Sequence, residues 1–313
     1  MLTLSDIQTA QRRLADYLSP TMLEPAPDLG DEVYLKLENT NRTHSFKIRG
    51  ALNAILSLDE DARARGIVAA SSGNHAQGVA YAAHLVNANA TILMPKHTPK
   101  KKVDGVLRYG AEAVLFGNTY DETEAEALRM VAEDKLTYIS PYNDPKVMAG
   151  AGTIGLEIIE QLPDVERVLV CVSGGGLIGG VATAIKSLKP DCEVIGVGAE
   201  SAPSMYNIFH DKDLPENWET LAEALSGGIE DNSITIPIVQ AQVDDIVLVT
   251  ESQIADAMHF IIAKQGWLVE GGGSVGVAAL LHGIVPNDKV TAVVVSGGNV
   301  DVETVRHILN HAN

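Results

Sequence analysis

The sequence predicts an α/β protein with two open, twisted sheets that carry helices on both faces. Short runs rich in Val, Ile and Leu alternate with helical patterns along almost the whole chain. Strands that are apolar throughout are typical of parallel sheets, because both faces of such sheets are buried. A chain of 313 residues is also long enough for two domains.

The first part of the chain predicts two helices around one strand. An amphipathic helix is expected over 5–18 with Ser5 as its cap, and three prolines then predict an irregular connection. A strand is expected at Val33–Leu37, followed by a helix over 46–58.

The rest of the chain predicts alternating strands and helices, with one irregular segment at 201–243 that we expect to form surface loops. Strands are predicted at 67–70, 91–94, 113–116, 137–139, 167–172, 194–197, 246–249 and 291–295. Helices are predicted at 75–86, 99–109, 120–133, 146–161, after the Gly-rich residues that follow 172 to about 188, at 275–283 and at about 302–309.

Composition and charge exclude several classes of function. The chain has 23 Lys and Arg against 41 Asp and Glu, a net charge of −18, which argues against binding nucleic acid or an anionic membrane. No apolar run reaches the roughly 20 residues of a membrane-spanning helix. The N-terminus lacks a signal-peptide pattern, and Cys171 and Cys192 lie in or beside apolar runs. These features predict buried thiols in a reducing compartment, the cytoplasm.

Lys47 occupies an unusual position for a solvated charge. It lies in the segment 43–50 (THSFKIRG), just inside a predicted helix start, behind a Thr/Ser cap and among apolar residues. Desolvation at such a place lowers the pKa of a lysine and makes its amine a nucleophile or a base. By itself, the segment fits a surface lysine near a helix N-terminus equally well.

Gly- and Ser-rich loops follow several of the predicted strands, at the sheet edge where such folds bind ligands. The loop 71–75 (SSGNH) offers two hydroxyls, an amide and the N–H groups of a helix start, which suit a carboxylate or another small anion. The alternative is an ordinary turn with a serine cap. The loop 173–180 (SGGGLIGG) suits a phosphate, because its glycines allow close approach and a helix N-terminus favours negative charge.

One of these loops has a further pattern, and two more Gly-rich loops follow later in the chain. Gly174, Gly176 and Gly179 satisfy the dinucleotide pattern G-x-G-x-x-G, but many Gly-rich turns do so, and the match indicates phosphate more specifically than NAD. Ser296 opens the loop 296–299 (SGGN) and either points its hydroxyl into the same crevice or caps the next helix. Glu270 opens a fourth Gly-rich loop.

Taken together, these motifs resemble those of the fold-type II pyridoxal-phosphate (PLP) enzymes, most closely the threonine/serine dehydratase and serine racemase family. Four motifs occur in the family's order and the resemblance covers nearly the whole chain: 45–50, 72–75, 173–176 and 296–299. The resemblance implies a tryptophan-synthase-β-like fold of two open α/β domains with the active site in the cleft between them. It also implies a homodimer.

The resemblance implies domain boundaries as well. A large PLP-binding domain would comprise 1–56 and 145–313. A small mobile domain, 57–144, would close over the substrate and exclude water.

Site residues are carried over by position. Lys47 would form the Schiff base with PLP, Asn74 would bond the ring hydroxyl and Ser296 would contact the pyridine nitrogen. The remaining implied cofactor contacts are Phe46, Ser173, Gly174, Gly175, Gly176, Leu177 and Glu270. The substrate carboxylate would be held by Ser71, Ser72, Asn74 and His75.

The implied activity is that of an ammonia-lyase, which converts L-threonine, L-serine or a related 3-hydroxy amino acid to a 2-oxo acid and ammonia. The freed Lys47 would remove the α-proton, while the cofactor would act as the electron sink. In racemases of the family, a serine at the position of Ser72 carries a proton on the face opposite the lysine. An amino-acid racemase using Lys47 and Ser72 is therefore the main rival hypothesis.

Departures from the family's common pattern leave the substrate open. His44, Ala151, Gly228 and the segment 271–274 differ from that pattern around the expected substrate side, so a 3-hydroxyaspartate-type dehydratase is a further hypothesis. A non-catalytic PLP carrier is another. An NAD-dependent oxidoreductase would leave the motifs of Lys47 and Ser296 unexplained.

The family's site for a divalent cation, Mg or Ca, has two candidate ligands in this sequence. Glu200 is in place and Ser204 could give a carbonyl oxygen, but Tyr206 lies near the expected carboxylate position. Hard cations require several oxygen ligands.

Overall fold

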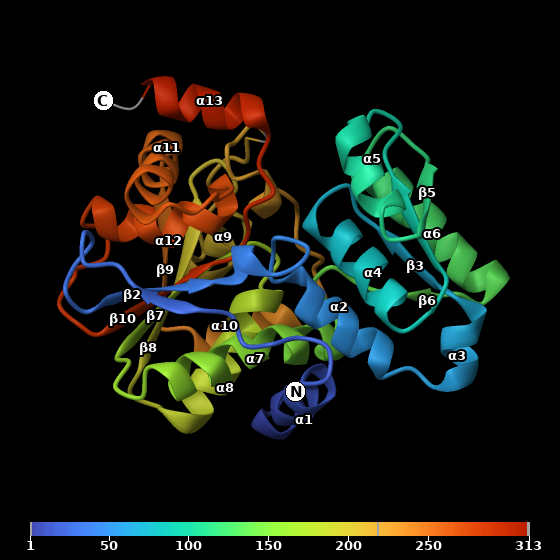
Figure 1. Ribbon diagram of the computed structural model, residues 1–313, viewed down its shortest axis with the longest axis horizontal. Coiled ribbons are helices and arrows are strands. Elements are labelled where there is room, and N and C mark those ends of the chain that lie inside the picture. Colours follow the sequence, from blue (N-terminus) through green and yellow to red (C-terminus); the bar gives the residue numbers. More distant parts are fainter. Residues whose placement is uncertain (1, 218, 312–313) are drawn as a thin grey trace.

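Two separate β-sheets organise the chain in the computed structural model, which describes residues 2–217 and 219–311 (Figure 1). The larger sheet has six strands in the order β1-β2-β10-β7-β8-β9. Its strands are β1 (Leu23–Pro25), β2 (Val33–Leu37), β7 (Arg167–Cys171), β8 (Glu193–Ala199), β9 (Asp245–Val249) and β10 (Thr291–Val295). All neighbours are parallel except β1, which is antiparallel to β2.

The smaller sheet has four parallel strands in the order β5-β4-β3-β6. They are β3 (Ile67–Ala70), β4 (Ala90–Met94), β5 (Glu112–Leu115) and β6 (Thr137–Tyr138). The prediction of an α/β protein with two parallel sheets is therefore confirmed.

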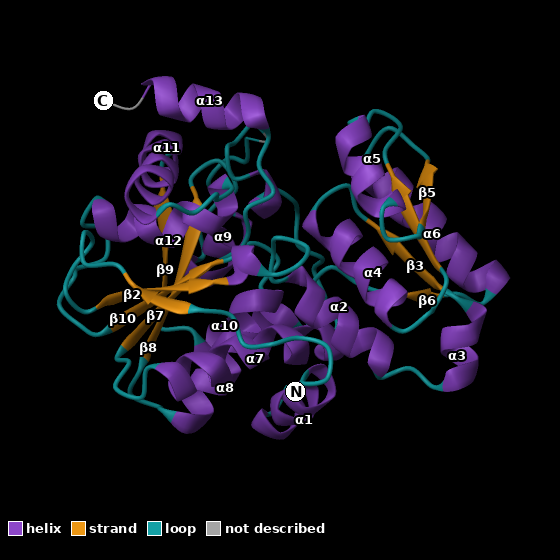
Figure 2. Cartoon of the chain, viewed as in Figure 1, coloured by secondary structure: helices purple, strands orange, loops and turns teal. Residues whose placement is uncertain are grey.

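Helices surround both sheets (Figure 2). The chain segment of the smaller sheet contains α3 (Glu60–Arg65), α4 (Asn74–Leu85), α5 (Lys100–Leu107) and α6 (Tyr120–Asp134). The rest of the chain contains α1 (Leu4–Leu14), η1 (Glu38–Thr40), α2 (Lys47–Leu56), α7 (Pro145–Gln161), α8 (Gly176–Leu188), α9 (Ser204–His210), η2 (Glu223–Leu225), α10 (Thr235–Gln242), α11 (Glu251–Phe260), the π-helical turn η3 (Ile261–Gln265), α12 (Gly271–Leu281) and α13 (Val302–His311).

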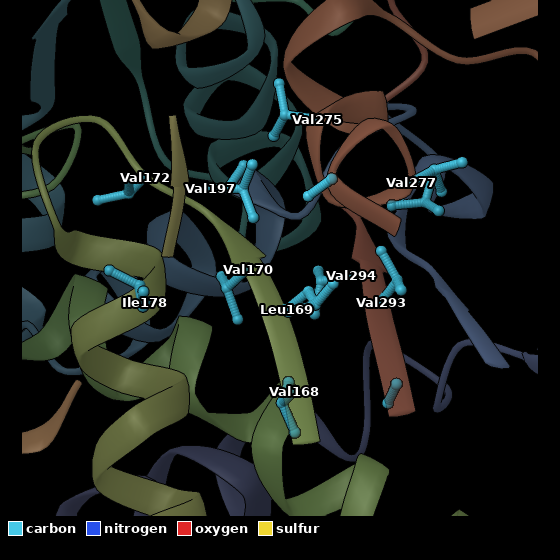
Figure 3. Close-up of a cluster of buried hydrophobic side chains, with 14 of the residues drawn as sticks. Val168, Leu169, Val170, Val172, Ile178, Val197, Val275, Val277, Val293 and Val294 are labelled. Carbon is cyan, nitrogen blue, oxygen red and sulfur yellow. The ribbon is translucent and has the colours of Figure 1, made fainter. Parts of the chain in front are cut away.

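The main core lies on both faces of the six-stranded sheet (Figure 3). On one face, α12 packs so closely that a Cβ on Gly276 would lie 2.6 Å from the side chain of Val293. On the other face, Ile178 of α8 reaches Gly196 of β8. Burial on both faces explains why the central strands are apolar throughout.

Some sequence predictions were wrong in detail. Helix α1 begins after Thr3, not Ser5, because Thr3 and Asp6 form a capping box. The segment 201–243 is not only loops, since α9, η2 and α10 lie within it. These helices are short, and Pro237 falls in the first turn of α10, where a helix tolerates a missing N–H.

The topology brings the predicted site together. The loops after β3, β7 and β10 all leave the carboxyl ends of parallel strands, where ligands of α/β sheets bind. Within the described ranges, no helix has the length and apolar character needed to cross a membrane.

Candidate active site

The lysine segment is attached to the loop after β10 by backbone contacts. Ser45 forms an isolated antiparallel bridge with Gly297, and the N–H of Phe46 donates to the carbonyl of Ser296 at 3.0 Å. Helix α2 then begins at Lys47, with Phe46 as its N-cap and no side-chain cap from the residues described. The expected Thr/Ser cap is therefore wrong, because the strand-like contact of Ser45 holds this end of the helix instead.

The amine of Lys47 is held within the protein. Its Nζ donates to the main-chain carbonyl of Pro141 at 2.8 Å and lies 5.2 Å from the centre of the Phe46 ring. Burial of the amine lowers the pKa of Lys47 to about 8, although Cys171 and Glu270 oppose the shift. About a tenth of the amine is therefore uncharged at pH 7 and able to act as a nucleophile or base.

The side chain of Asn74 is held by hydrogen bonds to Glu270 and Asn299. Its Nδ2 donates to Glu270 Oε1 at 2.6 Å, and its Oδ1 accepts from Asn299 Nδ2 at 2.7 Å. Burial raises the pKa of Glu270 to about 7, while hydrogen bonds from Asn74 and Asn299 oppose that rise. The amide of Asn74 has a fixed orientation and keeps one N–H for a ligand.

The loop 71–75 forms the N-terminal end of α4. The hydroxyl of Ser71 accepts from the N–H of Gly73 at 3.2 Å, and Gly73 is the N-cap. In the part of the chain that is described, the hydroxyl of Ser72 has no hydrogen-bond partner. Two half-buried serines and the N–H groups of a helix start are suited to a carboxylate.

His75 contributes to this loop as a neutral ring. It is buried, its Nε2 lies 2.8 Å from the carbonyl of Ile139, and its Nδ1 has no partner among the described residues. Burial, and then the charge of Lys47, lowers the pKa of His75 to about 3. His75 therefore fixes the loop that carries Pro141 but supplies no positive charge.

The loop after β7 has the shape of an anion cradle. Gly175 is the N-cap of α8 with a φ of 85°, a conformation that favours glycine. Thr235 Oγ1 donates to the carbonyl of Gly174 at 2.7 Å and holds the loop. The first N–H groups of α8 lie before the first intrahelical bond, from Gly179 to Gly175, so they are available to a phosphate.

Ser296 and Cys171 are neighbours at the ends of adjacent strands. Ser296 is buried and donates weakly to the carbonyl of Gly272 at 3.4 Å. Burial raises the pKa of Cys171 to about 11, so the thiol stays protonated. Both groups at this end of the site are therefore neutral.

The residues that depart from the family's common pattern differ in backbone conformation and in burial. His44 has a φ of 55°, in the left-handed region, which costs roughly 1 kcal/mol for a residue with a Cβ. Ala151 is buried in α7, and Gly228 is surrounded by open space. A Cβ on Gly271 would lie 2.2 Å from the carbonyl oxygen of Leu221, so a close backbone approach requires glycine there.

The two candidate metal ligands, Glu200 and Ser204, have different surroundings in the structure. The described residues contain no group of three or more His, Cys, Asp or Glu that could hold a metal ion. The hydroxyl of Ser204 is bonded to Glu216 and to the carbonyl of Gly227, while Glu200 is exposed beside a cavity of about 560 Å³. A hard cation requires several oxygen ligands at one point, so a site built on Glu200 and the carbonyl of Ser204 stays a prediction.

A family model described as pyridoxal-phosphate dependent enzyme matches residues 14–297. The chain belongs to the pyridoxal-phosphate-dependent enzymes. It is 46% identical over 99% of its length to the L-threonine ammonia-lyase of Thermotoga maritima, 79% of which is covered. It is 40% identical to the catabolic L-threonine dehydratase TdcB of Escherichia coli K12, with 98% and 96% of the two chains covered.

A solved structure with a similar fold is that of maize serine racemase. Its TM-score is 0.91 at 32% identity, and 99% of this chain and 97% of that chain are covered. The pyridoxal-phosphate-dependent fold predicted from the motifs is thus confirmed.

The geometry fits pyridoxal phosphate at both of its ends. Lys47 offers an amine with a lowered pKa, and the loop of Gly174 and Gly175 offers N–H groups for a phosphate. Buried polar atoms without described partners, Ser45 Oγ and His75 Nδ1, lie in the two segments around Lys47. Of the other predicted contacts, Leu177 is buried and Ser173 is half-buried beside the loop.

Sequence reasoning missed several groups of this site. The carbonyl of Pro141 has no sequence signal, because a backbone oxygen is present at every residue. Thr235 and Cys171 come from distant elements and lack a motif. Asn299 lies within the motif 296–299, and its amide side chain is the one available signal.

Proposed function

We propose that the protein is a PLP-dependent ammonia-lyase whose substrate is L-threonine, with L-serine as a second substrate. The Thermotoga maritima and Escherichia coli relatives, which carry threonine ammonia-lyase and dehydratase names, support the substrate. The observation that carries the chemistry is the amine of Lys47, which has a pKa of about 8 and lies beside a phosphate cradle and an anion loop.

Each end of the substrate has a matching group. Pyridoxal phosphate, when bound, supplies an electrophilic carbonyl for the amino group and a conjugated ring that accepts electrons. Ser71, Ser72 and the start of α4 hold the carboxylate. The uncharged amine of Lys47 takes the proton from the substrate's Cα, and the carbonyl of Pro141 keeps that amine oriented.

The overall reaction balances without a redox partner. Threonine loses its α-proton and its β-hydroxyl as water, and the resulting enamine takes up water to give 2-oxobutanoate and ammonia. Ser296 supports this outcome, because a neutral serine beside a neutral Cys171 offers no counter-charge to a protonated ring nitrogen. Less negative charge is then stored in the ring, and prompt loss of the hydroxyl is favoured.

A panel of amino acids tests this proposal. The purified yellow protein should release 2-oxo acid and ammonia in equal amounts from L-threonine, more slowly from L-serine, and least from D-threonine. A preference for 3-hydroxyaspartate would change the substrate but keep the reaction class. Cofactor absorbance that responds to no amino acid would instead indicate a carrier and overturn the proposal.

A second candidate function is amino-acid racemisation by Lys47 and Ser72. The similarity to maize serine racemase and the unpartnered hydroxyl of Ser72 favour it. We expect Ser72→Ala to weaken substrate binding by roughly 1 kcal/mol, which raises KM about five-fold, because one hydrogen bond to the carboxylate is lost. Formation of D-serine from L-serine, measured by chiral chromatography, should be negligible in both forms.

The outcome for D-serine separates the two functions. A wild-type protein that forms D-serine as fast as pyruvate, and a Ser72→Ala variant that loses only the D-serine, would establish the racemase instead. Ser57→Ala is the matched control, because the hydroxyl of Ser57 donates to the carbonyl of Asn53 at the end of α2, away from the loop 71–75. This control should leave KM unchanged.

The organisation of the molecule is part of the same proposal. The strands of the four-stranded sheet all fall within 57–144, which supports a small domain with these bounds and a large domain of 1–56 and 145–313. Two buried free cysteines support a cytoplasmic location. The homodimer rests on the family alone.

A further inference from the structure

The motif that carries Lys47 also contains Arg49, whose role the reaction leaves unexplained. Arg49 is 2% exposed and belongs to a cluster of four buried charged side chains. Its Nε and Nη2 donate to Glu38, both at 2.8 Å, and its Nη1 and Nη2 donate to Glu157 at 2.5 and 2.9 Å. Lys36 Nζ donates to the same Glu157 at 2.6 Å. We name these four residues the Arg49 cluster.

Neutral groups complete the Arg49 cluster. Thr153 Oγ1 accepts from Arg49 Nη1 at 3.0 Å, and Thr21 Oγ1 donates to Glu38 at 2.6 Å. Lys36 also donates to the carbonyl of Thr21 and to Gln161. Two cations therefore face two anions, and each cation's donors have partners, as a buried ion network requires.

The cluster joins segments that are distant in the sequence. Lys36 lies in β2, Glu38 in η1, Arg49 in α2 and Glu157 in α7. A buried ion network of this kind rarely stabilises a protein more than apolar residues of the same size would. Its distinctive property is geometric, because the planar guanidinium of an arginine donates to its carboxylate partners in fixed directions.

This geometry bears directly on Lys47. Two residues along an α-helix correspond to about 3 Å of rise and about 200° of rotation, so Arg49 and Lys47 point to opposite sides of α2. Figure 1 shows α2 between α7 and α4, and it packs against both. On the α4 side, a Cβ on Gly78 would lie 3.1 Å from the backbone of Lys47. The position and roll of the first turn of α2 are thus defined from both sides.

We propose that Arg49 is a positioning residue: by fixing the first turn of α2 to β2, η1 and α7, it aims the amine of Lys47 at the reacting carbon. The proposal rests on the proposed function, since the aim of Lys47 matters only if that amine does the chemistry. It goes beyond that function by assigning a role to a residue that touches neither cofactor nor substrate.

The test compares Arg49→Lys with Arg167→Lys. Arg167 is 3% exposed and is likewise bonded to two carboxylates, Glu193 and Asp288, but it lies at the start of β7, the end away from the candidate site. Both variants keep the charge and lose the fork. We expect both to lower Tm, but only Arg49→Lys to lower kcat, by roughly 100-fold, as for a misplaced catalytic group. KM should change little.

A second readout does not depend on turnover. Reductive methylation of the cofactor-free full chain, followed by mass spectrometry of the Lys47 peptide, reports the protonation of this amine against pH. We expect a midpoint near 8 in the wild type and after Arg167→Lys. The midpoint should move toward the ordinary lysine value after Arg49→Lys, because a loosened helix start exposes the amine to water. Glu270, Cys171 and His75, the titratable groups that interact with Lys47, stay unchanged.

Two outcomes would overturn the proposal. One is an Arg49→Lys variant whose kcat falls no more than that of Arg167→Lys at an equal loss of Tm. The other is an unchanged methylation midpoint. Should Arg49→Lys fail to fold, Thr153→Val removes one uncharged partner of Arg49 and should give smaller changes in the same two readouts. A wild-type protein without turnover would refute the proposed function, while the methylation experiment would still test Arg49.

Discussion

Lys47→Ala is expected to lower turnover of L-threonine by roughly 10⁴-fold, because general acid–base catalysis alone contributes up to that factor. The variant loses the amine whose pKa of about 8 makes it both a nucleophile and a base. It should also lose the visible absorbance of lysine-linked cofactor. The measurements are release of 2-oxo acid and an absorbance spectrum of the purified variant.

The control for this prediction is Lys186→Ala. Lys186 forms an ion pair with Asp244 across the surface between α8 and the start of β9, so the change should cost less than about 1 kcal/mol and leave turnover intact. Retained activity in Lys47→Ala would mean that another amine carries the chemistry. Borohydride reduction and peptide mapping would then identify that amine directly.

Gly150→Ala is expected to destabilise the protein by about 3 kcal/mol, the upper part of the range for overpacking, and to reduce turnover as well. A Cβ at this position of α7 would lie 2.4 Å from the carbonyl oxygen of Arg49 and 2.8 Å from Cα of Gly50. Both obstacles are backbone atoms, so no side chain can rotate away. Relief requires α2 to move off α7, and Lys47 moves with it.

Denaturant unfolding and steady-state kinetics measure the two effects of Gly150→Ala. The matched control is Gly228→Ala, where open space surrounds the glycine and the free energy of unfolding should stay within about 0.5 kcal/mol. An alanine at 150 that left stability and turnover unchanged would show that the contact between α2 and α7 adapts. In that case the placement of Lys47 would depend less on this helix pair than the structure indicates.

The alternating pattern of apolar strands and helices is enough to predict the fold class. Parallel strands are buried on both faces, so their composition identifies them without a partner. The pattern predicts strand β2 at Val33–Leu37, the bounds that the structure has. It fails where elements are short or polar, as for α3 and α9, since a few residues cannot show a helical period.

The same limit applies to the candidate site. Lys47, Asn74 and the glycines at 174–176 can be predicted because each is a side chain or a backbone conformation that requires a particular residue type. The carbonyl of Pro141 and the hydroxyl of Thr235 cannot, because their positions depend on how distant segments fold back.

By itself, the sequence determined the fold class and the order of the loops, and it predicts the residues that bind a phosphate, a carboxylate and an aldehyde. Those properties are local, since they follow from burial pattern, glycine conformation and functional group. Only the tertiary structure decided that Lys47 faces Pro141 and that Asn74 lies between Glu270 and Asn299. It also decided that Arg49 binds Glu38 and Glu157 inside the protein. Lowered pKa values and fixed orientations arise from groups far apart in the chain, and they exist only once folding has removed water from between them.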